Sequence, residues 1–352
     1  MRSMATTWLA ALVLALGFGL GLPAGAQDNP FANGWTLAKD GSTLGFQSVK
    51  NETKVEGSSF ATFSGTISES GDVEVRVALD SVDTKIDLRN VRMRFLFFET
   101  FKYPEAIITA HIDPAMIADL ATKRRIAISM PYTLDLHGTK MERTSDISVT
   151  LISNDMVAVA SVAAIPVATA DFNLDEGITK LQEAAKVKIV PTGSITFDWL
   201  FQRNGTSGAP AIDTTPTQPE TTALETTGNF DAEACKGRFE ILSNSGNINF
   251  RSGSAKLDVA GSAILDNLYD IVNRCPDMKL EIGGHTDDAG SDATNQALSE
   301  KRADSVIAYL AAKGIPSARM VARGYGEAVP LVPNDSAENM ARNRRIEFKV
   351  IN

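Results

Sequence analysis

A segment poor in large apolar residues divides the 352-residue chain into two parts. From Arg203 to Asn229 the sequence is dominated by threonine, proline, glycine and serine, as in Thr214-Thr215-Pro216-Thr217-Gln218-Pro219. Such a composition cannot bury enough apolar surface to form a core, and it is typical of a flexible linker. We therefore expect two domains, residues 34–202 and 230–352, and a linker over residues 203–229 that lets one domain move relative to the other.

The N-terminus has the features of a secretory signal peptide. Arg2 precedes an apolar run from Trp8 to Leu22, and Ala24-Gly25-Ala26 provides a small-residue cleavage site before Gln27. The run is short and interrupted by glycine, so an uncleaved membrane anchor is the less favoured alternative. No other apolar run is long enough to span a bilayer. We predict a signal peptide over residues 1–26 and a mature protein without an integral membrane span.

Charge and histidine content exclude several partners. The formal net charge is -9, whereas nucleic acid and anionic membrane surfaces favour clustered lysine and arginine. We therefore expect no nucleic acid partner, and a neutral or zwitterionic ligand fits better. The chain has three histidines, none of which lies near a cysteine in the sequence, so we expect no metal site and no cofactor.

Both cysteines, Cys235 and Cys275, belong to the second part of the chain. In an exported protein, two thiols in one domain more often pair than remain free, so we predict a disulfide between them. Two buried free thiols are the alternative.

The first part of the chain has the periodicity of β-strands. Apolar and polar residues alternate over residues 73–79, and the same pattern recurs over residues 126–130, 147–151 and 195–199. Many short amphipathic strands in one domain indicate an all-β antiparallel barrel or sandwich. Two helical interruptions are expected. One begins at Asp113-Pro114, which combines an N-cap residue with proline at the first helical position, and the other covers residues 174–186.

The second part alternates strands with helices, which indicates an α/β domain. We expect a strand near Ile248 and Phe250, a helix from about Asp258 to Pro276, a strand over residues 278–282 and a helix over residues 298–313. Asp287 then follows a strand, and Arg302 lies on the first turns of the next helix. The two can converge on a ligand that carries both an amine and a carboxylate, because aspartate accepts from an ammonium and arginine grips a carboxylate. Taken singly, Asp287 is as well explained as a capping residue and Arg302 as a solvated helix residue.

The ordered motifs of the second part resemble the C-terminal domain of the OmpA family. They are Gly284-His285-Thr286-Asp287, Asn295 with Leu298-Ser299 and Arg302-Ala303, Gly314-Ile315, Gly324-Tyr325-Gly326 and Asn343-Arg344-Arg345. The resemblance implies that the domain binds peptidoglycan, with Asp287 and Arg302 holding the zwitterionic end of diaminopimelate in the stem peptide. It also places Asn295, Leu298 and Arg344 in the binding site. Many members have an arginine where this chain has Met340, which concerns secondary contacts.

The first part resembles the YceI family. The similar segments are Trp35-Thr36-Leu37, Phe60-Ala61-Thr62-Phe63-Ser64-Gly65, Asp80-Ser81-Val82-Asp83-Thr84, Tyr103-Pro104 and Leu134-Asp135-Leu136-His137-Gly138. The resemblance implies a lipocalin-like antiparallel barrel that holds a polyisoprenoid lipid, and a barrel of about eight strands has room for one slender apolar ligand. Arg89-Asn90 departs from the family's usual Arg-Asp, which leaves the ligand's identity open.

Aromatic residues and a histidine suggest further roles in this barrel. An aromatic cluster could line the mouth of a lipid tunnel, although such clusters more often form ordinary core: Phe95, Phe97, Phe98, Phe101 and Tyr103. Of these, Phe95, Phe98 and Phe101 are the selected tunnel candidates. His137 invites a catalytic interpretation, but its place between a strand and Gly138 favours a structural turn residue.

Three classes of function remain. The chain could be a binding protein that holds peptidoglycan and a lipid, a wall-tethered protein-interaction module whose barrel contains no lipid, or an enzyme. No serine–histidine–aspartate order, metal-ligand cluster or phosphate loop stands out, so we expect no enzymatic activity. The expected location is the periplasm in association with the cell wall, and proximity to the outer membrane is left open.

Overall fold

The computed structural model describes residues 29–205, 228–245, 248, 250–251, 253–258 and 262–351. The predicted signal peptide and most of the predicted linker lie outside these residues. Within them, none of the helices combines the length and apolarity that crossing a membrane requires.

Eight of the described strands close into an antiparallel barrel, because β11 pairs with β1 as well as with β9. Around the ring the order is β11-β9-β8-β7-β6-β4-β3-β1, and β10, β2 and β5 extend it at its edges. This confirms the predicted antiparallel lipocalin-like barrel. The strands are β1 (Trp35–Lys50), β2 (Lys54–Phe60), β3 (Phe63–Ile67), β4 (Asp72–Ala78), β5 (Val82–Asp83), β6 (Glu105–His111), β7 (Arg125–Leu136), β8 (Thr139–Ser153), β9 (Met156–Ser161), β10 (Ile165–Ala168) and β11 (Thr192–Arg203).

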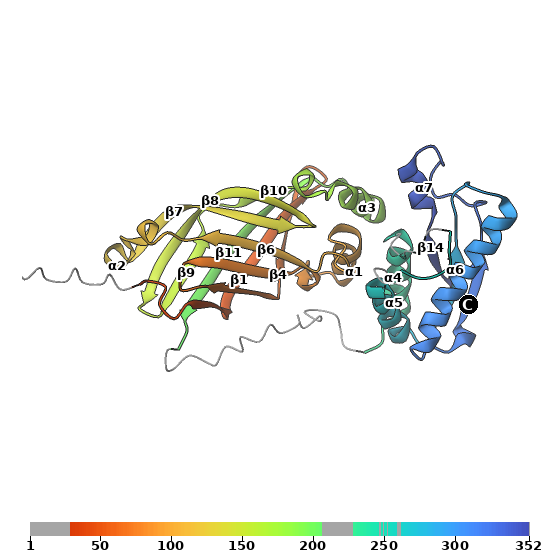
Figure 1. Ribbon diagram of the computed structural model, residues 1–352, viewed down its shortest axis with the longest axis horizontal. Helices are drawn as coiled ribbons and strands as arrows, with labels where there is room; N and C mark the ends of the chain where they lie inside the picture. Colours follow the sequence, from red (N-terminus) through yellow and green to blue (C-terminus); the bar gives the residue numbers. More distant parts are fainter. Residues whose placement is uncertain are drawn as a thin grey trace, which may run out of the picture.

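Short helical segments lie at the two ends of the barrel (Figure 1). One end carries η3 (Pro114–Ile117) and α2 (Leu120–Lys123), and Asp113 caps η3 by accepting a hydrogen bond from Ala115 N at 2.8 Å. At the other end lie η1 (Leu79–Ser81), α1 (Asp87–Arg92), η2 (Met93–Phe97), η4 (Thr169–Phe172) and α3 (Asp175–Ala185). The helices expected at Asp113 and over residues 174–186 are therefore present, whereas α1 and η2 were not predicted.

The second domain packs helices against a three-stranded sheet of order β13-β12-β14. β12 runs parallel to β13 and antiparallel to β14. Its elements are α4 (Ala232–Ser245), α5 (Ser262–Arg274), β12 (Lys279–Gly284), α6 (Asp292–Ala312), η6 (Ser317–Arg319), β13 (Met320–Gly324), α7 (Ala337–Asn343) and β14 (Ile346–Ile351). The predicted α/β class is confirmed.

Two features near the start of this domain differ from the sequence prediction. Phe250 takes part in a single bridge with Leu257 instead of a full strand. Helix α4, which was not predicted, precedes it and buries Cys235, Phe239 and Leu242. The arginine at 238 and the glycine at 237 interrupt the apolar pattern of α4, which explains why its periodicity is hard to see. Cys235 and Cys275 form the predicted disulfide, so α4 is linked covalently to the residue that follows α5.

Candidate functional site

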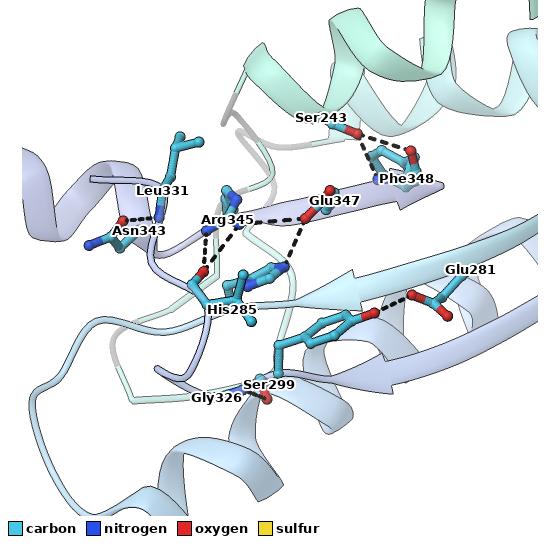
Figure 2. Close-up of polar contacts among 12 residues, drawn as sticks. Ser243, Glu281, His285, Ser299, Gly326, Leu331, Asn343, Arg345, Glu347 and Phe348 are labelled. Carbon is cyan, nitrogen blue, oxygen red and sulfur yellow. Dashed lines mark hydrogen bonds and ion pairs between the residues drawn. The ribbon is translucent and has the colours of Figure 1, made fainter. Parts of the chain in front are cut away.

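Glycines allow helix α6 to lie directly against the sheet of the second domain. Gly284 of β12 and Gly324 of β13 are paired neighbours. A Cβ atom at Gly284 would lie 2.0 Å from the carbonyl oxygen of Ser299, and one at Gly324 would lie 2.7 Å from that of Gln296. The fully buried Ser299 hydroxyl also accepts a hydrogen bond from Gly326 N at 3.0 Å (Figure 2). The glycines thus bring the start of α6 against the ends of two parallel strands.

Asp287 follows β12 at this edge of the sheet and is 8% exposed. Its Oδ2 accepts a hydrogen bond from Arg344 Nη1 at 2.5 Å, and its Oδ1 accepts one from Ala289 N at 3.2 Å. Arg344 is the residue after α7, and it lies 57 positions after Asp287 in the chain. The loop after β12 and the end of α7 therefore share one ion pair.

Arg302 approaches the same place from α6. Its Nε donates to Ser254 O at 3.1 Å, and its guanidinium carbon lies 5.1 Å from the centre of the Phe250 ring. Burial lowers the pKa of Arg302, the positive charge of Arg344 lowers it further, and Asp287 acts in the opposite direction. Two guanidinium groups and one carboxylate therefore converge. A buried cation whose charge is incompletely balanced favours an additional anion.

Asn295 and Leu298 have different surroundings from the charged groups. Asn295 is 3% exposed, and its Nδ2 lies 3.3 Å from the carbonyl oxygens of Asp287 and Ala289 and 2.5 Å from Glu327 Oε2. It fixes the loop that carries Asp287. Leu298 is half-buried on α6. Sequence reasoning missed Glu327, which follows the Gly324-Tyr325-Gly326 motif directly and could have been found from that position.

A buried histidine supports the edge of the site. His285 is 2% exposed, its ring stacks on Tyr325 with 4.9 Å between the centres, and its Nε2 lies 3.1 Å from Glu347 Oε2 (Figure 2). The contact with His285 lowers the pKa of Glu347, and the charge of Arg345 lowers it further. Partial burial tends to raise this pKa, but the net effect is a lowering. Tyr325 donates from its hydroxyl to Glu281 at 2.5 Å, which raises the pKa of that tyrosine.

Asn343 shapes the loop that precedes α7. Its Oδ1 accepts a hydrogen bond from Leu331 N at 2.8 Å (Figure 2). Its Oδ1 also accepts one from Val332 N at 3.0 Å, and its Nδ2 donates to Val332 O at 2.8 Å. The side chain is fully buried. The first residue of the Asn343-Arg344-Arg345 motif is thus a scaffold for the loop before α7, and the second reaches the charged cluster.

The barrel encloses a cavity of about 1020 Å³, at the upper end of the range of small-molecule sites. Most of its lining is apolar, and it extends from the η3–α2 end to the α1–η2 end of the barrel. Lining residues include Phe31, Phe46, Val75, Val77, Phe97, Phe98, Ile108, Ala110, Ile117, Leu120, Ile128, Ile147, Leu174, Phe197 and Phe201. A site of this shape suits a long, flexible apolar molecule better than a compact polar one.

Of the three selected tunnel candidates, one lines the cavity and two do not. Phe98 lines the cavity, together with Phe97 of the same predicted cluster. Phe95 is buried in the core and Phe101 packs against it, and neither is among the residues that line the cavity.

His137 occupies a tight turn, as the structural alternative predicts. Its φ is +52° and that of Gly138 is +75°. Its ring centre lies 4.2 Å from that of Tyr103, and its Nδ1 is 3.2 Å from Phe172 O. The neighbouring Glu99 is largely buried, and burial tends to raise its pKa, but contacts with His137 and Lys180 lower that pKa overall.

Comparison with known families separates the chain into the same two parts. The family model described as the YceI-like domain matches residues 35–200, and the one described as the OmpA family matches residues 249–344.

Individual relatives resemble one part or the other. Outer membrane porin F of Pseudomonas aeruginosa is 36% identical over 38% of this chain and 37% of its own length. The peptidoglycan-binding protein ArfA of Mycobacterium bovis is 37% identical over 30% of this chain and 32% of its own length. A solved polyisoprenoid binding domain from Saccharophagus degradans is 32% identical, covers 48% of this chain and 98% of that chain, and has a TM-score of 0.46. The chain therefore spans about a third of the length of these two curated relatives.

Proposed function

Because residues 35–200 belong to the YceI-like domain family and residues 249–344 to the OmpA family, we propose that the chain is a cell-envelope protein with two binding sites. The second domain binds peptidoglycan without forming a covalent bond. The barrel holds an isoprenoid or another long-chain lipid. Both are binding functions, and the protein is not an enzyme.

The observation that carries the peptidoglycan proposal is the convergence of Asp287, Arg302 and Arg344 at one edge of the sheet. The zwitterionic end of diaminopimelate offers an ammonium to Asp287 and a carboxylate to Arg302. Arg344 pairs with Asp287 and holds that carboxylate in place before a ligand arrives. The name of the ArfA relative, a peptidoglycan-binding protein, supports the same function.

Co-sedimentation with purified sacculi that contain diaminopimelate tests this site. Removing one partner of a buried charge pair costs about 2–5 kcal/mol, so Asp287→Ala and Arg302→Ala should each weaken binding more than tenfold. The matched controls are Asp288→Ala and Lys301→Ala, which change exposed charges one position away. These should bind like the wild type. Full binding by folded Asp287→Ala and Arg302→Ala would refute the assignment of the site.

The lipid proposal rests on the cavity, whose lining is mostly apolar. Mass spectrometry of the organic extract of the full chain, purified from the periplasm without detergent, tests it. We expect one long-chain lipid per molecule. An empty barrel that cannot take up added isoprenoid would instead favour a wall-tethered protein-interaction module. Release of fragments from sacculi by the pure protein would contradict the non-enzymatic assignment.

A further inference from the structure

Helix α4 of the second domain lies against the end of the barrel that carries α1 and η2 (Figure 1). Nη2 of Arg238 on α4 donates to Oδ2 of Asp87 on α1 at 2.5 Å. One turn of α4 is adapted to this contact, because a Cβ atom at Gly237 would lie 2.8 Å from Leu88 Cδ1. The two residues of the ion pair are 151 positions apart in the chain.

The arginine is held in place by its own domain. Its guanidinium carbon lies 3.7 Å from the centre of the Phe230 ring, and its Nη1 donates to Ala234 O at 3.4 Å. Only 1% of Arg238 is exposed. A cation that is removed from water to this degree is stable only with charged or hydrogen-bonding partners, and the Asp87 carboxylate from the barrel is one of them.

On the barrel side, a buried asparagine fixes helix α1. Asn90 on α1 is 5% exposed, and its Oδ1 accepts hydrogen bonds at 2.7 Å from both the backbone nitrogen and the hydroxyl of Thr84. Helix α1 is thereby fastened to the segment after β5. The following segment, η2, contacts α4 and also places Phe97 against the cavity. Buried apolar residues form one continuous cluster through both domains.

We propose that α4 and the α1–η2 segment form a docking interface that holds the two domains as one body. Domains joined by a linker are ordinarily free to move unless a specific interface restrains them. Here a buried arginine, oriented in advance by Phe230, pairs with Asp87 beside a glycine that leaves room for Leu88. The proposal goes beyond the two binding functions, and the interface exists whether or not the barrel holds a lipid.

Docking fixes the orientation of the barrel relative to the second domain. The domain that carries Asp287 and Arg302 and the η3–α2 end of the barrel lie at opposite ends of the long axis (Figure 1). The α1–η2 end of the cavity is the one that faces the second domain. If the second domain is held at the cell wall, as the proposed function states, the η3–α2 end of the cavity points away from that attachment.

Small-angle X-ray scattering of the full chain tests the docking. Asp87→Arg places two guanidinium groups against each other and should increase both the radius of gyration and the maximum dimension. Asp119→Arg makes the same charge change beside α2, at the far end of the barrel, and should leave both values unchanged. Combining Asp87→Arg with Arg238→Asp restores an ion pair of reversed polarity and should return the scattering curve toward that of the wild type.

A second variant avoids any change of charge. Gly237→Phe inserts a side chain between α4 and Leu88, and it should also extend the molecule, whereas Lys236→Phe on the exposed neighbouring position should not. Circular dichroism and the retained binding of sacculi show that both domains of each variant are folded. The proposal is overturned if the wild type scatters as two independently moving bodies, or if neither Asp87→Arg nor Gly237→Phe changes the radius of gyration.

Discussion

The barrel cavity and the charged cluster at the edge of the second domain's sheet, the two proposed binding sites, are built in opposite ways. The cavity spreads its contacts over apolar side chains from many strands, and each contributes a small part of the burial energy. The charged cluster concentrates its effect in Asp287, Arg302 and Arg344. We therefore expect the cavity to tolerate single truncations and to select ligands by length and shape, and we expect the charged cluster to lose binding when one of its charged groups is removed.

The supporting structure differs in the same way. The barrel is closed by backbone pairing of β1 with β11, so its interior depends on the whole ring. The charged site depends on a few close approaches, at Gly284, Gly324 and Ser299, and on the side-chain amides of Asn295 and Asn343. The alternating apolar pattern of the strands therefore specifies the cavity, whereas a few individual residues specify the charged cluster.

Removing the disulfide should have the largest effect on stability, and it should destabilise the second domain much more than the barrel. The bond closes a loop of 40 residues, so the double variant Cys235→Ala, Cys275→Ala should destabilise the second domain by about 4 kcal/mol. The barrel contains neither cysteine, and its own unfolding should change much less. Differential scanning calorimetry measures both effects. Equal shifts of all transitions would indicate that the regions do not unfold separately.

Narrowing the cavity should have the next largest effect, on one region only. Ala110 lines the cavity from β6, so Ala110→Phe should reduce the amount of bound lipid by at least about tenfold while binding of sacculi is unchanged. Thr109→Phe places the same ring on the outer face of β6 and is the matched control. Quantitative mass spectrometry of extracted lipid gives the comparison. Normal lipid content in Ala110→Phe would mean that the ligand does not occupy this part of the barrel.

The smallest expected effect is a pH dependence confined to the second domain. The pKa of Glu347 is lowered by contact with His285, so ionised Glu347 stabilises the folded state above pH 4.5, the ordinary pKa of glutamate. This contribution is lost as the pH falls through the lower pKa of the folded protein. Glu347→Gln should therefore be less stable than the wild type at pH 7, and the difference should shrink as the pH falls below 4.5. Urea unfolding at pH 7 and at several pH values below 4.5 measures it, and a difference that does not shrink with falling pH would exclude this origin.

Several features of both regions could be predicted from sequence. The alternation over residues 73–79 corresponds to β4, and the predicted helix over residues 174–186 is α3 to within one residue at each end. The ordered motifs also indicated that Asp287 and Arg302 lie close together. The predicted start of the helix was wrong, because α6 begins at Asp292 and Arg302 lies ten residues further on, beyond its first turns. These signals are local, or they are repeated in a family pattern.

Other features could not be predicted because they depend on how side chains face in irregular segments. Phe95 and Phe98 are three residues apart in and beside η2, yet Phe98 lines the cavity and Phe95 does not. The segment is a π-helical turn, so neither a period of 2 nor one of 3.6 residues describes it. The pairing of Arg344 with Asp287 likewise depends on the path of the loop before α7, which Asn343 sets.

The sequence by itself determined the division into two domains, the class of each domain and the placement of a carboxylate and a guanidinium at a strand–helix junction. Apolar periodicity and motif order suffice for these, because they record which face of an element is buried. Only the tertiary structure decided that Asp87 meets Arg238, that Arg344 joins the charged cluster and that the barrel encloses a continuous cavity. These features depend on which elements that are distant in sequence pack together, and a local sequence pattern does not identify the element against which it packs.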